Sequence, residues 1–303
     1  MTAPGLPDTE HRGLIACLPE RLQPYAILAR FDRPIGWWLL FWPCAWGLLL
    51  AGGKDRWPLL LWFLLGSVVM RGAGCVWNDY VDRDLDRKIT RTASRPLASG
   101  AIGTRQALLW LAVLAAIGLL VLLQLRWQAQ LVALASLAPV AAYPLMKRIT
   151  WWPQAWLGLV FSWGALVAWV EIGNPAWAVL GLLYAGAICW TIGYDTIYAL
   201  QDLEDDALVG VRSSARAMGP HVRGGVTLFY GAAAGFWALA FWLLREQWLV
   251  LVALLPAATH LGWQIVTLRP DNAADPLAKF RSNRTTGLLV ALACLVAGNA
   301  GLG

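Results

Sequence analysis

The 303-residue chain is 59% hydrophobic and 14% charged, whereas soluble domains carry about 25% charged residues. This composition excludes an ordinary water-soluble protein and indicates a chain embedded in lipid. The net charge of +6 would also suit a nucleic-acid-binding protein, but its distribution along the chain argues against nucleic acid. No two of the five cysteines stand at metal-ligand spacing and the three histidines form no cluster, so a zinc site is not expected.

The N-terminal segment, residues 1–34, is of mixed polarity and shows no cleavable signal peptide. We expect a cytoplasmic or interfacial segment, with a short helix over 18–30 lying along the membrane surface. The rest of the chain contains no linker or low-complexity tract. Residues 1–303 are therefore predicted to form a single transmembrane domain.

Apolar runs near the ~20 residues that cross a bilayer predict an all-α, polytopic membrane protein with about nine transmembrane helices. Several tryptophans, including Trp57, Trp177 and Trp248, sit at the ends of these runs, as in an aromatic belt at the lipid headgroups. The predicted spans are 35–52, 57–77, 106–124, 129–146, 154–171, 176–194, 225–243, 247–268 and 286–302.

Lysine and arginine alternate between the two ends of these spans. The N-terminal segment and the loops after even-numbered spans hold nineteen of the 24. By the positive-inside rule, this asymmetry predicts that the N-terminus and the even loops are cytoplasmic and that the C-terminus faces outward. The positive charge is thus a topology signal, and the host compartment we expect is a bacterial inner membrane.

An acidic cluster follows the second span. On a continuing helix, Asn78, Asp82 and Asp86 share one face, Asp79 borders it, and Asp84 points elsewhere. Carboxylates on one face repel each other unless a cation holds them. Ligands that are all oxygen suit a hard cation, most plausibly Mg²⁺.

A second acidic cluster follows the sixth span. Asp202 and Asp206 are four residues apart, and Asp195 lies close to the same helical face. Two such edges are expected to clamp a diphosphate through bridging metal ions. The alternative is solvated loop charge, but a chain with 18 acidic residues concentrates them at two matching depths, which favours a site.

Basic side chains in the same loops are candidates for neutralising a leaving diphosphate. Arg83 lies within the first acidic cluster. Lys147 and Arg148 are adjacent at the end of the fourth span, and Tyr143 stands four residues before Lys147. Positive-inside charge alone is the alternative explanation for about half of such cations. Arg71 is different, because it lies inside the second span, where an unpaired charge is costly. It either pairs with an aspartate or faces the substrate pocket and receives a substrate carboxylate.

These motifs resemble the UbiA superfamily of intramembrane prenyltransferases, and within it the 4-hydroxybenzoate polyprenyltransferases. The resemblance rests on the run from 71 to 100 (RGAGCVWNDYVDRDLDRKITRTASRPLASG), on FDRPIGWWLLFWPCAWGL at 31–48, YPLMKR at 143–148, YDTIYALQDLEDD at 194–206 and FRSNRTTG at 280–287. It extends in order over nearly the whole chain. Leu203, Glu204 and Arg212 are mild departures from the family's usual choices.

The resemblance implies helices around a central cavity and an active site that binds Mg²⁺ and diphosphate. Carried over by motif, the metal ligands are Asn78, Asp82, Asp86, Asp202 and Asp206. The residues implied for substrate binding are Arg71, Asn78, Arg83, Tyr143, Lys147, Arg148 and Tyr194. The four aspartates Asp82, Asp86, Asp202 and Asp206 are implied as catalytic, together with Asp195. For the ring proton, both the Asp195 region and the released diphosphate are candidate acceptors.

The expected reaction transfers a polyprenyl group from polyprenyl diphosphate to the carbon ortho to the hydroxyl of 4-hydroxybenzoate, in ubiquinone biosynthesis. Partners beyond these two substrates and membrane lipid are not indicated. A different acceptor, such as homogentisate, a naphthoate or haem, is the nearer alternative. A transporter is the more distant alternative. A transporter should carry charges near the midplane of several spans, whereas nearly all the charge of this chain lies at the ends of the spans, with Arg71 as the main exception.

Overall fold

The computed structural model describes residues 12–87, 92–203, 210, 212–270, 272 and 274–299, without the side chains of Arg12, Leu14, Lys147 and Asp202. The described residues form helices and turns and contain no β-strand. By internal contacts the chain divides into two compact units. Unit 1 comprises residues 1–38 and 64–124, and unit 2 comprises 39–63 and 125–303.

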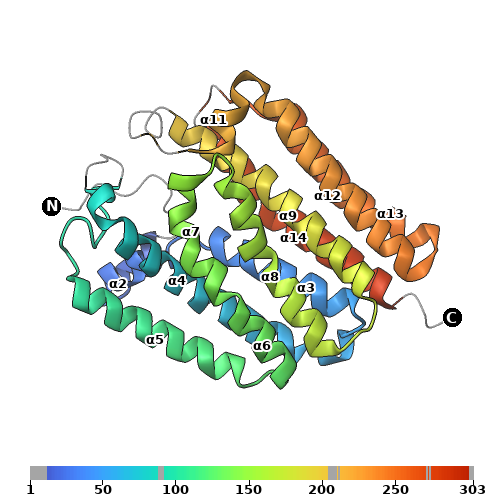
Figure 1. Ribbon diagram of the computed structural model, residues 1–303, viewed down its shortest axis with the longest axis horizontal. Helices are drawn as coiled ribbons and strands as arrows, with labels where there is room; N and C mark the ends of the chain where they lie inside the picture. The colour runs from blue at the N-terminus through green and yellow to red at the C-terminus, as the bar shows by residue number, and fades with distance from the viewer. Residues whose placement is uncertain are drawn as a thin grey trace. The chain divides into compact units, whose positions relative to one another are not determined.

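Each predicted span corresponds to a helix or a helix pair, drawn in Figure 1. The bounds are α3 Ile35–Leu50, α4 Pro58–Asp86, α5 Thr104–Leu122, α6 Trp127–Ala135, α7 Leu137–Ile149, α8 Pro153–Ile172, α9 Trp177–Ala199, α12 Val222–Arg245, α13 Trp248–Thr267 and α14 Ala274–Asn299. Shorter helices are α1 Arg12–Ala16, α2 Gln23–Leu28 and α11 Ser214–Met218, with 3₁₀ turns at Lys54–Arg56, Leu200–Asp202 and Gly219–His221.

Seven helical segments of the described chain are long and apolar enough to cross a membrane, so the expected count of about nine is approximate. The first expected span, 35–52, is the 16-residue helix α3, which ends at Leu50. It stops there because Gly52 takes a φ of +90°, a left-handed conformation that terminates helices. The ninth, 286–302, is the second half of α14, whose first half carries Asp275, Lys279, Arg281 and Arg284.

The expected surface helix over 18–30 is shorter than predicted. Helix α2 spans six residues, Gln23–Leu28, with Pro24 in its first turn. Its C-terminal end is buried in unit 1, where Leu28 and Ala29 pack in an apolar cluster with residues of α4 and α5. The cluster contains Leu28, Ala29, Val69, Ala73, Val76, Leu97, Ile102, Ala107 and Leu114.

Within unit 2, α9 packs against α8 and α12, and α13 packs against α14 (Figure 1). Three tryptophans from distant parts of the sequence meet in its interior. The ring of Trp46 lies 5.0 Å from that of Trp190 and 5.3 Å from that of Trp237, centroid to centroid. Because aromatic rings bury large apolar areas, this trio forms the centre of the unit.

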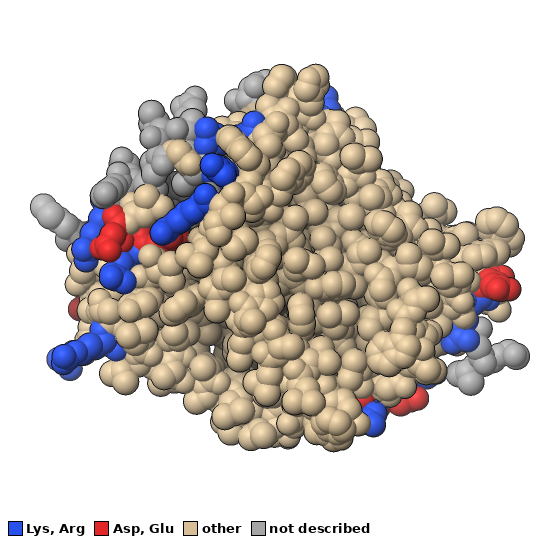
Figure 2. Space-filling view, viewed as in Figure 1, with Lys and Arg blue, Asp and Glu red and all other residues tan. Residues whose placement is uncertain are grey.

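The surface is that of a membrane protein. Figure 2 shows a face on which most atoms belong to uncharged residues. Large apolar side chains are open on the outside of the helices, among them Leu228 at 70% and Val266 at 76% exposure. Trp57, Trp177 and Trp248 are exposed beside or at the starts of α4, α9 and α13, where an aromatic belt places them. Together with the seven membrane-length segments, this shows an integral membrane protein.

Candidate active site at the end of helix α4

The 29-residue helix α4 runs without a break into the first acidic cluster. One face of its last two turns is buried: Asp79, Asp82 and Asp86 on this face are 2–4% exposed. Asp84, two residues from Asp82 and Asp86, is 72% exposed. The helical period of 3.6 residues accounts for this division. Charge is therefore concentrated on the buried face of one helix end.

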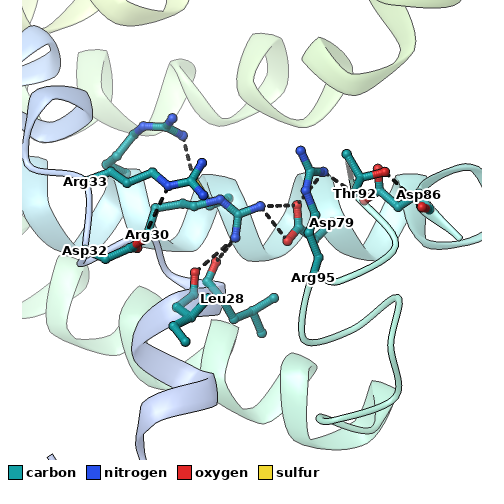
Figure 3. Close-up of polar contacts among 11 residues, drawn as sticks. Leu28, Arg30, Asp32, Arg33, Asp79, Asp86, Thr92 and Arg95 are labelled. Carbon is teal, nitrogen blue, oxygen red and sulfur yellow. Dashed lines mark hydrogen bonds and ion pairs between the residues drawn. The ribbon is translucent and has the colours of Figure 1, made fainter. Parts of the chain in front are cut away.

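Arg30 is the main counter-ion of Asp79. Its Nη2 atom donates hydrogen bonds to both carboxylate oxygens of Asp79, at 3.0 and 2.9 Å, as Figure 3 shows. Its Nη1 atom donates to the carbonyl oxygens of Ile27 and Leu28, at 3.0 and 3.4 Å. Burial opposes the charged form of Arg30, but the carboxylate of Asp79 outweighs it and raises the pKa of Arg30 above its ordinary value. The guanidinium is thus a permanent cation against the acidic face.

Arg30 also has an uncommon backbone. It is one of two described non-glycine residues with positive φ, at 58°. Such a conformation costs of order 1–3 kcal/mol and persists only where surrounding contacts fix it. The contacts here are the two hydrogen bonds to α2 carbonyls and the pair with Asp79. The chain therefore accepts local strain in order to place this guanidinium.

Arg95 links Asp79 to Asp86. Its Nη1 atom lies 2.8 Å from Asp86 Oδ2 and 3.2 Å from Asp79 Oδ1. The loop that carries Arg95 is fastened to the helix end by Thr92, whose hydroxyl donates to the backbone carbonyl of Asp86 at 2.8 Å (Figure 3). A single guanidinium is therefore shared between two carboxylates of the acidic face.

The residues at this helix end fit a hard cation. The side-chain oxygen of Asn78 is buried and accepts no hydrogen bond in the described structure, although a buried polar atom without a partner is costly. With Asp82 and Asp86 it offers oxygen ligands, and Mg²⁺ takes one or two protein carboxylates and completes its shell with water and phosphate. Among the described residues, no three acidic, histidine or cysteine side chains are already grouped to hold an ion.

Two cations predicted from the sequence also lie in unit 1. Arg71 Nη1 is 2.6 Å from the sulfur of Cys75, one turn along α4. Gly36 makes room for this arginine, since a Cβ at Gly36 would stand 2.7 Å from Arg71 Nε. Arg83 donates to the carbonyl of Tyr80 at 3.0 Å and lies over the Tyr80 ring. Neither contact assigns these arginines to a substrate.

The remaining predicted site residues belong to unit 2. Tyr194 is fully buried in α9, with its ring packed against Trp190 and Phe280. Asp195, next to it, is half-buried, as is Tyr143 in α7, whereas Arg148 is exposed. Asp202 ends a 3₁₀ turn after α9, but its side chain and that of Lys147, and the whole of Asp206, lie outside the described residues. The second acidic edge thus remains a prediction.

Two features of the site were not found by reasoning on the sequence. The sequence places Asp79 only at the border of the acidic face and predicts no pairing for Arg30 or Arg95. The contact between Arg30 and Asp79 joins residues 49 positions apart, and no local spacing rule could have revealed it.

An all-helical membrane fold with a buried acidic helix end lined by arginines fits an intramembrane transferase that acts on a phosphorylated lipid. Residues 40–297 match the UbiA prenyltransferase family, and the chain belongs to that family.

The curated relatives cover most of the chain. It is 43% identical over 292 residues to the mitochondrial 4-hydroxybenzoate polyprenyltransferase of Drosophila pseudoobscura pseudoobscura, covering 95% of this chain and 74% of that protein. The protein of the same name from Arabidopsis thaliana is 43% identical over 90% of this chain and 68% of its own length. The one from Bos taurus is 44% identical over 93% and 76%.

Solved structures share the fold. A UbiA homolog from Aeropyrum pernix K1, in its apo form, aligns with a TM-score of 0.63 and 24% identity, covering 86% of this chain and 97% of that one. A UbiA homolog from Archaeoglobus fulgidus bound to GPP and Mg²⁺ aligns with a TM-score of 0.63 and 18% identity, covering 88% and 99%. At these identities the likeness concerns the fold.

Proposed function

We propose that this protein transfers a polyprenyl group from polyprenyl diphosphate to the ring carbon ortho to the hydroxyl of 4-hydroxybenzoate. Family membership and the names of relatives at 43–44% identity over most of the chain support the reaction. In the structure itself, the main support is the buried acidic face of α4, where Asn78 offers an oxygen that accepts no hydrogen bond in the described structure.

Asn78, Asp82 and Asp86 are proposed to hold Mg²⁺ on this face, and Asp202 and Asp206 to hold it on the second edge. A divalent cation is consistent with the related structures from Archaeoglobus fulgidus, of which one is bound to GPP and Mg²⁺ and another to Cd²⁺. When bound, Mg²⁺ would draw charge from the diphosphate and make it a better leaving group. In the structure Arg95 neutralises Asp86, so Asp86 would exchange this contact for one with the metal.

The cations of this chain are proposed to receive the diphosphate. Arg83, Lys147 and Arg148 would share its negative charge as the carbon–oxygen bond lengthens, and Tyr143 would donate a hydrogen bond. Arg71, which lies inside a membrane-length helix, is proposed to receive the carboxylate of 4-hydroxybenzoate. Tyr194 and its buried aromatic neighbours would shape the wall beside the substrate.

In the reaction, the bond between C1 of the prenyl chain and the diphosphate oxygen breaks, and its electron pair leaves with the diphosphate. The electron-rich ring of the phenol forms a new carbon–carbon bond to C1. The ring proton then leaves, either to Asp195 or to the released diphosphate. A lipid-embedded protein suits this chemistry, because an allylic cation must be kept from water and the prenyl tail belongs in hydrocarbon.

The membrane in question is not identified by the sequence. The curated relatives named above are mitochondrial proteins, so they give no support to the expected bacterial inner membrane. We propose the orientation alone: the N-terminus, the loops after even-numbered spans and both acidic clusters lie on the side favoured by positive charge.

The function is tested by transfer of radiolabelled 4-hydroxybenzoate into an organic-soluble product, using membranes that contain the protein, polyprenyl diphosphate and Mg²⁺. Asp82→Asn is expected to reduce the rate about a hundredfold or more, because it removes a proposed ligand of the metal that would draw charge from the diphosphate, and EDTA should abolish it. Asp84→Asn makes the same chemical change at an exposed position of the same helix and should keep nearly the parent rate.

Loss of label transfer in every protein, including the parent, would sink the acceptor assignment and favour homogentisate, a naphthoate or haem. Transfer that survives both Asp82→Asn and Asp202→Asn would show that the acidic faces do not hold the metal.

A further inference from the structure

Both carboxylate oxygens of Asp79 already have hydrogen-bond partners. Oδ1 accepts hydrogen bonds from Arg30 at 3.0 Å and from Arg95 at 3.2 Å, and Oδ2 accepts one from Arg30 at 2.9 Å. Asn78, next to it, has an oxygen that accepts none in the described structure. The side-chain oxygens of these two neighbouring residues therefore differ: that of Asn78 could bind a metal ion, whereas those of Asp79 are already occupied by arginines.

The partner Arg30 belongs to a segment that packs closely on α4. A Cβ at Gly72 would meet the side chains of Ala29 and Phe31 at 3.2 and 3.3 Å, so this glycine lets the segment approach the helix. Arg71, the residue before Gly72, contacts Cys75 one turn further along α4 and lies beside Gly36. Residues 29–36 thus cover the face of α4 that leads to Asp79.

Charge is balanced along a chain of four side chains: Arg30, Asp79, Arg95 and Asp86 (Figure 3). Asp79 holds two guanidiniums, and one of them also holds Asp86. If the charge of Asp79 were removed, Arg95 would be left to Asp86 alone, and two cations would remain beside the position of the metal. Both effects disfavour a divalent cation at Asp86.

We propose that Asp79 is a positioning residue that fastens the N-terminal segment to α4 through Arg30 and, by sharing Arg95, keeps Asp86 available to the metal. The inference rests on the proposed function, since it concerns the same metal site. On this proposal, the segment at residues 29–36 contributes to the metal site through Arg30.

Removing Asp79 and removing Arg30 should have different effects on the Mg²⁺ concentration that the enzyme requires. Asp79→Asn should raise the Mg²⁺ concentration for half-maximal activity about 10–100-fold, as is usual when a group behind a metal ligand is lost. Arg30→Gln removes a cation and leaves Asp79 with Arg95, so the Mg²⁺ requirement should stay equal or fall. A purely structural role would move both variants in the same direction.

Docking of the segment is measured independently of activity by the labelling of Cys75. Cys75 is 5% exposed and lies one turn before Asp79, so the folded parent should react slowly with a maleimide, as followed by mass spectrometry of its peptide. Both Asp79→Asn and Arg30→Gln should label Cys75 faster, while Asp79→Glu and Arg30→Lys, which keep the charges, should restore part of the protection.

Asp84→Asn is the matched control, because Asp84 is exposed and pairs at 3.8 and 3.6 Å with Arg83 and Arg87. It should change neither Cys75 labelling nor the Mg²⁺ requirement. An unchanged Mg²⁺ requirement in Asp79→Asn, or a rise of the same size in Arg30→Gln, would overturn the proposal. A parent that transfers no prenyl group, yet shows the predicted labelling pattern, would instead overturn the proposed function and leave the docking role in place.

Discussion

Asn283 lies in a network of side-chain hydrogen bonds that joins four helices of unit 2. Its oxygen accepts from Trp190 Nε1 at 2.8 Å, and its amide nitrogen donates to Gln264 Oε1 at 3.1 Å. The same Gln264 oxygen accepts from the hydroxyl of Tyr230 at 3.0 Å. The residues come from α9, α14, α13 and α12, and Asn283 is fully buried. A satisfied polar network of this kind specifies one arrangement of the helices.

Asn283→Ala is therefore expected to lower the free energy of unfolding by about 1–2 kcal/mol, since it takes away the acceptor of the buried Trp190 indole N–H and one of the hydrogen bonds of Gln264. Thermal unfolding of the purified protein in detergent measures the effect. Ser282→Ala is the control, because the Ser282 hydroxyl donates within its own helix, to the carbonyl of Lys279. Equal stability of the two variants would show that the network contributes nothing to unit 2.

The side chains that the sequence could predict are those whose relation is local. The spacing of Asp82, Asp84 and Asp86 on one helix was enough to anticipate that Asp84 would point away from the other two, as their exposures have it. The partner of Asp79 was not predictable, because Arg30 is brought to it by the packing of a separate segment. Asn283 could be recognised only as part of a family-like motif, since its partners Trp190 and Gln264 lie on other helices.

Helices pack most closely where glycine removes the side chain, and α3 meets α8 in this way. A Cβ at Gly47 would stand 2.5 Å from the carbonyl oxygen of Ala165 and 3.0 Å from its Cα. These are backbone atoms, so no rotamer change can relieve the clash. Small residues at such crossings are the usual basis of helix association in membranes.

Gly47→Ala is expected to destabilise the protein by about 1–3 kcal/mol, because overpacking forces α3 and α8 apart. The matched change, Gly262→Ala in α13, meets no atom within 4 Å and should be neutral or slightly stabilising, given the better helix propensity of alanine. Unfolding midpoints measured side by side test the pair. A Gly47→Ala protein as stable as the parent would contradict the packing of α3 on α8.

Hydropathy predicted the helices of this protein better than their ends. Long apolar runs identify membrane helices because the backbone must satisfy its own hydrogen bonds in lipid. Their limits depend on single residues: Gly52 with its positive φ ends α3 early. Asn272 extends α14 to an earlier start, since its side-chain oxygen accepts from the backbone nitrogen of Ala274. Such caps add polar turns that hydropathy assigns to loops.

For the molecule as a whole, the distribution of positive charge is the feature that governs orientation. Nineteen of the 24 lysines and arginines lie in the N-terminal segment and the loops after even-numbered spans. Each misplaced basic loop would have to cross the bilayer during insertion, so we predict that the cumulative bias favours one orientation. Both acidic clusters lie next to these loops, so the predicted orientation would also determine the side on which the diphosphate must be supplied.

Orientation is tested with one exposed cysteine at a time, near opposite ends of the predicted spans. Cys17 is exposed in the N-terminal segment, and Gln247 is exposed just before α13. In intact cells that carry the protein in their plasma membrane, a membrane-impermeant thiol reagent should label a Gln247→Cys, Cys17→Ser protein at residue 247, whereas Cys17 of the parent should react only after permeabilisation. Transfer activity of each variant confirms that it is folded. Labelling of Cys17 in intact cells would show the opposite orientation. The diphosphate would then have to reach the acidic clusters from outside, and the charge asymmetry would not explain how the protein inserts.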